Sequence, residues 1–207
     1  MNTSLKSLFA MVLLSGAGSA VAASSVDLTV KGMITPSACE PTLSSGGVYD
    51  VGKISAKDLN ADKSTVLPEH TLQLTVTCDA ATLMAIEPQD NRAGSSFESD
   101  PATFGLGLIN SSEKLGSFAM NLSSMLADGQ EVRPIVSTDA GLTWSQSVYL
   151  TNAGITSVAN TTTIAPIPVQ SLTSNLTLSP IIAPATSLTL TNEVAIDGSV
   201  TLTVKYL

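Results

Sequence analysis

The chain has 207 residues, of which 43% are hydrophobic, 4% aromatic and 13% charged, a balance that excludes a disordered protein and fits one modest globular domain or at most two small ones. The formal charge of −8 argues against nucleic acid as a partner, because phosphate binding needs a basic stripe and the chain has only nine Lys and Arg. One His and two Cys exclude a metal site built from these residue types, and we expect no cofactor.

The first two dozen residues have the chemistry of a secretory signal peptide. Lys6 gives a short positive region, the apolar run at 8–14 follows, and small residues end it at 20–22. A buried N-terminal helix is disfavoured, since no polar face alternates with the apolar one. The apolar run is also too short to span a bilayer. We therefore expect residues 1–22 to be removed, and residues 23–207 to form a single exported domain without a membrane span.

The two cysteines, Cys39 and Cys78, are expected to form a disulfide. In an oxidising compartment thiols are usually paired, and these two are the only possible pair in the chain. Closing a loop of about 40 residues would stabilise the fold by roughly 4 kcal/mol on the chain-entropy model. A redox role is disfavoured, because the spacing is not that of a Cys-x-x-Cys motif.

After residue 25 the apolar residues follow a period of two, which predicts β-strands. The pattern starts at Val26, Leu28 and Val30 and is clearest at 200–206, where apolar and polar residues alternate without interruption. Only residues 55–62 and 122–127 look briefly helical. Further strands are predicted at 48–54, 72–78, 82–87, 103–110, 115–122, 131–137, 143–151, 162–169 and 172–182.

Turn sequences separate the predicted strands at short and even intervals. Gly-Gly at 46–47, Asp-Gly at 128–129 and 197–198, and Asp-Ala-Gly at 139–141 each offer the positive φ that tight turns require. Short strands at this spacing are typical of an all-β sandwich rather than of βαβ units. Residues 153–184, rich in Thr, Pro and Ala, are either a linker or, as we expect, edge strands and loops, because their Ile and Val need burial.

Several stretches resemble those of chaperone–usher fimbrial subunits, or pilins. They are Leu-Thr-Val-Lys-Gly-Met-Ile-Thr-Pro-Ser-Ala-Cys at 28–39, the second cysteine that follows it, and the last strand with its penultimate Tyr206. The resemblance is narrower to a little-characterised group of fimbrial-subunit-like exported bacterial proteins, and it extends over essentially the whole chain after residue 22. The stretches that carry this narrower resemblance lie at 104–108, 127–129, 137–144 and 197–199.

This resemblance implies an immunoglobulin-like β-sandwich that lacks its final strand and has a hydrophobic groove beside its C-terminal strand. A periplasmic chaperone would lend a strand first, and the N-terminal extension of another fimbrial subunit would replace it. With an outer-membrane usher as a further partner, the implied function is that of a non-enzymatic subunit that passes through the periplasm to a fimbrium on the cell surface. The acceptor side would be lined by Val200, Leu202, Val204 and Tyr206.

Two questions stay open on this interpretation. Val200 to Tyr206 are either an acceptor strand or ordinary core residues of a complete sandwich. The predicted donor segment holds Val26, Leu28 and Val30, but if the first strand starts near Leu28, only about five residues after Ala23 stay free and span at most roughly 17 Å, about half of what a donor strand needs.

Three alternatives follow for the N-terminal segment. Residues 26–34 are themselves the donor, the cleavage site lies elsewhere, or the subunit accepts a strand without donating one efficiently. The short tail also favours a rival function, a self-contained periplasmic or secreted binding module whose ligand is a glycan or an envelope protein.

The sharpest local match is Ser-Thr-Asp-Ala-Gly-Leu-Thr-Trp at 137–144, which fits the Asp-box hairpin of sialidases and other propellers. We expect a structural role, in which the Asp bonds to the backbone of the turn, the Gly is left-handed and the Trp packs in the core. The residues of this motif are Ser137, Asp139, Gly141, Thr143 and Trp144.

Nothing else in the sequence predicts an enzyme. Sialidase chemistry needs an arginine cluster, and the chain has only Arg92 and Arg133. His70 stands at a strand entrance, where a solvated histidine is expected, and no Gly-x-Ser-x-Gly elbow exposes a serine. The acidic residues between 90 and 100 are interpreted as a solvated turn rather than as acid catalysts or a loose Ca²⁺ site.

Overall fold

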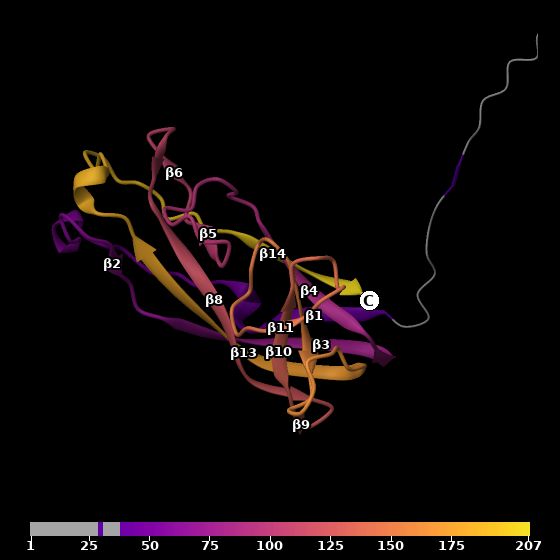
Figure 1. Cartoon of the computed structure of the whole chain (residues 1–207). Coiled ribbons are helices and arrows are strands. Elements are labelled where there is room, and N and C mark those ends of the chain that lie inside the picture. The colour runs from indigo at the N-terminus through magenta and orange to yellow at the C-terminus, as the bar shows by residue number, and fades with distance from the viewer. Residues whose placement is uncertain (1–28, 31–37) are drawn as a thin grey trace, which may run out of the picture. The chain divides into compact units, whose positions relative to one another are not determined.

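The structure, a computed structural model, describes residues 29–30 and 38–207. From residue 38 onward the chain is all-β, with two main antiparallel sheets and one small hairpin sheet, so the expected β-sandwich is confirmed (Figure 1). The predicted signal peptide lies outside the described residues, as do Val26 and Leu28 of the predicted donor segment. Within the described residues, no helix has the length and apolar character needed to cross a membrane.

The larger sheet has the strand order β1-β3-β13-β8-β5, with β2 paired to β13 and β9 to β8. Its long strands β8 and β13 lie side by side along most of their length (Figure 1). The bounds are β1 (Cys39–Leu43), β2 (Thr65–Val66), β3 (His70–Thr82), β5 (Thr103–Gly105), β8 (Gly116–Ala127), β9 (Gln130–Glu131) and β13 (Val169–Ile182).

The smaller sheet has the order β11-β10-β12-β4-β14, which leaves the C-terminal strand β14 at its edge. Its strands are β4 (Met84–Asp90), β10 (Arg133–Ser137), β11 (Ser145–Gln146), β12 (Ile155–Ala159) and β14 (Val200–Tyr206). The hairpin sheet and the short 3₁₀ turns are β6 (Leu108–Ile109), β7 (Glu113–Lys114), η1 (Ser44–Gly47), η2 (Ala56–Asp58) and η3 (Ala185–Ser187).

One hydrophobic core lies between the two main sheets, because apolar residues two apart along a strand point to the same face. The disulfide between Cys39 and Cys78 is confirmed, and it joins β1 to β3 at directly opposed positions. The core includes Leu74, Val76, Phe118, Leu122, Leu172 and Leu176 from the larger sheet and Met84, Ile86 and Val158 from the smaller one.

Most of the predicted strands exist, but several predictions are wrong. Residues 48–54 form no strand, 162–169 contributes only Val169, the first residue of β13, and 143–151 holds only the two-residue β11. The helical interpretation of 122–127 is wrong because this stretch is the end of β8 and pairs with β13. The strands predicted at 72–78, 82–87, 103–110, 115–122, 131–137, 172–182 and 200–206 correspond to β3, β4, β5 with β6, β8, β10, β13 and β14.

Three of the four predicted glycine turns have the expected backbone and the fourth does not. Gly46 and Gly47 have positive φ values of 62° and 73°, and Gly129 and Gly141 of 77° and 91°. Gly198, in contrast, is needed for close packing rather than for a left-handed turn. A Cβ atom at Gly198 would lie 2.9 Å from Leu106 Cδ2 and 3.0 Å from Phe118 Cε1.

The position of the first described strand corrects the prediction for the N-terminal segment. Thr29 and Val30 belong to no strand, and the Val30 side chain is 88% exposed. The strand β1 begins at Cys39 rather than near Leu28. Roughly 16 residues therefore separate Ala23 from β1, and an extended chain of that length spans up to ~50 Å.

Candidate partner-binding cleft

Within the described residues, the backbone of β14 pairs with another strand on one side only, the side of β4. Beyond the two ends of the strand, Asn91 donates its N–H to Ser199 O at 3.0 Å, and Leu207 donates its N–H to Leu83 O at 3.1 Å. The register with β4 does not shift between these points. Bonded positions alternate along an antiparallel pair, so the odd-numbered residues of β14 bond to β4. The N–H and C=O groups that point away from β4 belong to Val200, Leu202, Val204 and Tyr206.

The side chains of β14 alternate as the sequence predicts. Val200, Leu202 and Val204 are half-buried and pack against the core, whereas the threonines and the lysine between them are exposed. Tyr206 is 38% exposed, and its hydroxyl oxygen accepts the N–H of Cys39 at 3.0 Å. The inward apolar side chains of Val200, Leu202 and Val204 therefore belong to residues whose backbone groups point away from β4.

A cleft of about 770 Å³ lies beside this open strand. One wall is formed by residues 190–202, which lead into β14, and the other by residues 43–59. The rim is polar, whereas the floor consists of core side chains, so a partner's side chains could reach the interior of the sandwich. The floor residues include Leu72, Leu106, Leu115, Phe118, Met120, Leu176 and Leu178.

An extended chain is the ligand that this geometry suits. Main-chain hydrogen bonds to the even residues of β14 would add a strand to the sheet edge, and alternate side chains would fill the apolar cleft. The sequence predicts the strand at 200–206 but not the cleft wall upstream of it. Val194 and Ile196 are half-buried and continue the period of two from β14, and this is the signal that marks the wall.

The Asp-box-like turn is held by its own polar side chains. Ser137 Oγ donates to Asp139 Oδ1 at 2.7 Å and accepts the N–H of Gly141 at 2.8 Å. The hydroxyl and the backbone N–H of Thr143 both donate to the Asp139 carboxylate. These bonds, with the Thr143 hydroxyl first, lower the pKa of Asp139 to about 2. The side chain of Trp144 is half-buried rather than in the core, which corrects the expectation, and its Nε1–H donates to Gly141 O at 3.1 Å.

Residues considered for catalysis lie apart and have other partners. His70 opens β3, is half-buried and stacks on Tyr49 with ring centroids 4.4 Å apart. Arg92 forms an ion pair with Asp197 at 2.6 Å, which anchors the segment leading into β14. The guanidinium of Arg133 bonds instead to a carbonyl of the loop after β12, at 2.8 Å. No arginine cluster forms from these two residues.

The acidic residues between 90 and 100 bond to nearby backbone groups. Asp90 accepts the N–H of Arg92 at 2.8 Å and that of Gly105 at 3.0 Å, and Asp100 accepts the N–H of Ala102 at 2.8 Å. Over the described part of the chain, no three His, Cys, Asp or Glu side chains gather closely enough to hold a metal ion.

Comparisons with known proteins assign no activity to the chain. A family model described as a protein of unknown function (DUF1120) matches residues 28–104. Protein GltF of Escherichia coli (strain K12) is 28% identical over 233 aligned residues, which cover 91% of this chain and 92% of that protein. The uncharacterized protein YhcF of the same strain is 29% identical over 127 aligned residues, which cover 51% of this chain and 53% of that protein. The function must therefore be argued from the cleft.

Proposed function

We propose that the protein is a non-enzymatic subunit of the fimbrial type, whose cleft is filled by a β-strand that another chain donates. The observation that carries the proposal is the meeting of an open strand edge and an apolar cleft. The even residues of β14 turn their backbone groups away from β4, and the cleft, which Val200 and Leu202 line, reaches the core. A strand added by another chain would pair with these backbone groups and place its side chains in the cleft.

The proposed partners are a periplasmic chaperone, an outer-membrane usher and other fimbrial subunits. On this view the chain is exported, is held by the chaperone in the periplasm, and then joins a fimbrium at the cell surface. The segment with Val26, Leu28 and Val30 remains the predicted donor toward another subunit. Because β1 begins at Cys39, the tail has the length that a donor needs, and the rival function of a self-contained binding module loses the argument that favoured it.

Co-expression with a periplasmic chaperone tests the proposal. The two proteins should copurify, and the chaperone should protect the subunit from proteolysis. Leu202→Asp places a charge in the cleft and should abolish copurification, whereas Thr203→Asp, exposed on the outer face of the same strand, should not. Urea unfolding of both variants separates lost binding from lost folding. A chaperone-independent monomer that both variants leave unchanged would contradict the proposal.

A further inference from the structure

Residues 48–59, here called the strap, form most of the cleft wall that faces β14. Val51, Ile54 and Leu59 are half-buried, pack against the core and line the cleft. The strap therefore covers part of the apolar floor with its own side chains.

The strap is not part of either sheet. Its backbone N–H groups make only local bonds, such as that of Val48 to Ser45 O at 3.3 Å and that of Gly52 to the Asp50 carboxylate at 2.8 Å. Among residues 38–207, no backbone hydrogen bond joins the strap to a strand. Side-chain contacts alone hold it over the cleft, and such a segment opens more easily than a paired strand.

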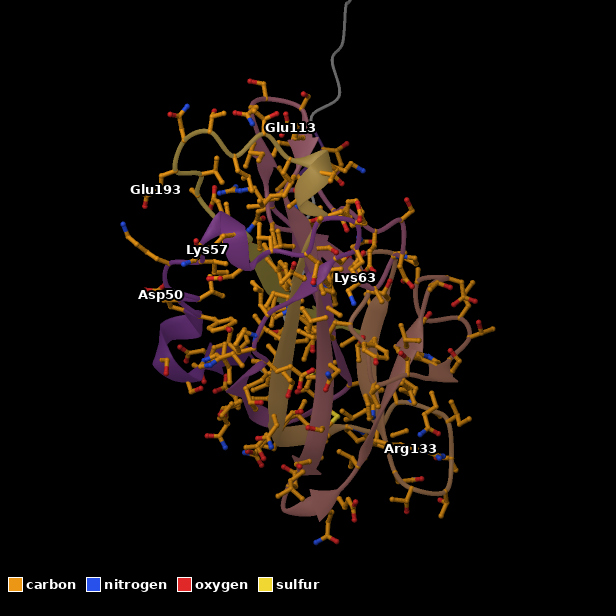
Figure 2. The ribbon with its side chains drawn as sticks, turned by 90° about the vertical axis from the view of Figure 1, so that its left-hand side faces the viewer. Asp50, Lys57, Lys63, Glu113, Arg133 and Glu193 are labelled. Carbon is orange, nitrogen blue, oxygen red and sulfur yellow. A yellow bond between two sulfur atoms is a disulfide. The ribbon has the colours of Figure 1, made fainter. Side chains whose placement is uncertain are left out.

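An ion pair links the two walls of the cleft. Lys53 Nζ on the strap lies 3.1 Å from Glu193 Oε1 on the opposite wall, and the two side chains are 89% and 82% exposed. Figure 2 shows Asp50 and Lys57 of the strap on the same side of the molecule as Glu193. An exposed pair of this kind is weak and is screened by salt, so it can break and re-form readily.

We propose that the strap is a displaceable wall that covers part of the cleft floor until a partner strand enters. This inference rests on the proposed function, because it assigns the regulation of the same cleft. A strand added along β14 must place its side chains over the floor where Val51 and Ile54 now pack, so the two compete. The strap leaves by giving up side-chain contacts, and no sheet hydrogen bond breaks.

Charge reversal at the Lys53–Glu193 pair is the first test. The probe is a synthetic peptide of residues 24–36, and the readout is its association rate at low salt. Lys53→Glu sets two like charges across the cleft and should raise the rate about 1.5- to 5-fold. Lys57→Glu, on the same strap but in no ion pair of the described residues, should leave it unchanged. Combining Lys53→Glu with Glu193→Lys should restore the original rate.

Removing the apolar contacts of the strap is the second test. Val51→Ser combined with Ile54→Ser should raise the association rate roughly ten- to a hundredfold and increase the fluorescence of a hydrophobic dye bound to the peptide-free protein. Val48→Ser is the control, since that side chain is 65% exposed. Urea unfolding midpoints check that the variants remain folded.

The outcomes separate the strap from the proposed function. If the dye signal rises but the peptide binds no variant, the cover is supported and the proposed donor is contradicted. If the peptide binds every variant at one rate and the dye signal is constant, the cover is overturned and strand acceptance stands. If the peptide binds no variant and the dye fluorescence does not rise, the proposal that the strap is a cover is overturned as well.

Discussion

Proline substitutions at two adjacent positions of β14 test the two sides of its backbone separately. The N–H of Val204 points away from β4, so Val204→Pro leaves the ladder to β4 intact, as proline does at a sheet edge. The N–H of Thr203 points toward β4, and Thr203→Pro removes a ladder hydrogen bond. We expect the first variant to lose strand binding and the second to lose stability.

The size of both effects follows from one missing donor. In the complex, Val204→Pro leaves the carbonyl of the added strand unsatisfied, which costs about 1–3 kcal/mol. Each 1.4 kcal/mol is about tenfold in affinity, so binding should weaken by roughly 5- to 150-fold. In Thr203→Pro a similar cost, about 1–3 kcal/mol, falls on the free energy of unfolding of the unbound protein.

Two measurements read out this pair of variants. Titration calorimetry with the chaperone or with the peptide of residues 24–36 gives the affinity, and urea denaturation of the unbound protein gives the stability. The reasoning is refuted if Val204→Pro destabilises the unbound protein as strongly as Thr203→Pro, or if it leaves the affinity unchanged.

The remaining predictions concern stability. Replacing Cys39 and Cys78 with Ser should lower the free energy of unfolding by about 2–5 kcal/mol, and an unchanged urea midpoint would contradict a stabilising disulfide. The folded pKa of Asp139, about 2, lies below its ordinary value of 3.8, so its contribution to stability is present above pH 3.8 and is lost as the pH falls toward 2. Asp139→Asn should therefore flatten the acid unfolding curve in that interval, as followed by circular dichroism, and a curve of unchanged slope would count against the turn. Gly198→Ala forces a Cβ atom to within 2.9 Å of Leu106 Cδ2 and should lower the free energy of unfolding by about 1–3 kcal/mol, as measured by thermal unfolding. An unchanged unfolding temperature would contradict the prediction and show that the Leu106 and Phe118 side chains move aside.

The sequence was most informative where burial alternates along a strand. The period of two at 200–206 and 72–78 predicts β14 and most of β3, because inward residues of an edge or central strand must be apolar while their neighbours need not be. The disulfide was predictable because the chain offers a single pair of cysteines.

The wrong predictions have identifiable physical causes. Residues 122–127 carry helix-favouring Leu, Met and Ala, but pairing with β13 overrides this preference, and Ser124 takes a φ of 50° beside a register shift. β1 contains Pro41 and shows no alternation, since only its two end residues are half-buried. Residues 153–184 were expected to form edge strands and loops, but their two strands β12 and β13 are inner strands of the two main sheets.

The cleft itself was only partly predictable. The resemblance to pilins implies a groove beside the last strand, and of the four residues named from the pattern of β14, Val200 and Leu202 line the cleft whereas Val204 and Tyr206 do not. The opposite wall was not predictable, because Val51 and Ile54 follow no strand or helix period and contact the core only through the tertiary fold. The Lys53–Glu193 pair likewise joins segments 140 residues apart, and sequence spacing carries no signal for such a contact.

Amide hydrogen exchange in β14 tests the central claim most directly. The amides of Thr201, Thr203 and Lys205 should be protected in the unbound protein, and those of Leu202 and Val204 should exchange rapidly and become protected only when the chaperone or a donor strand binds. Slow exchange of Leu202 and Val204 in the isolated monomer, or no change on partner binding, would contradict a strand edge that awaits another chain.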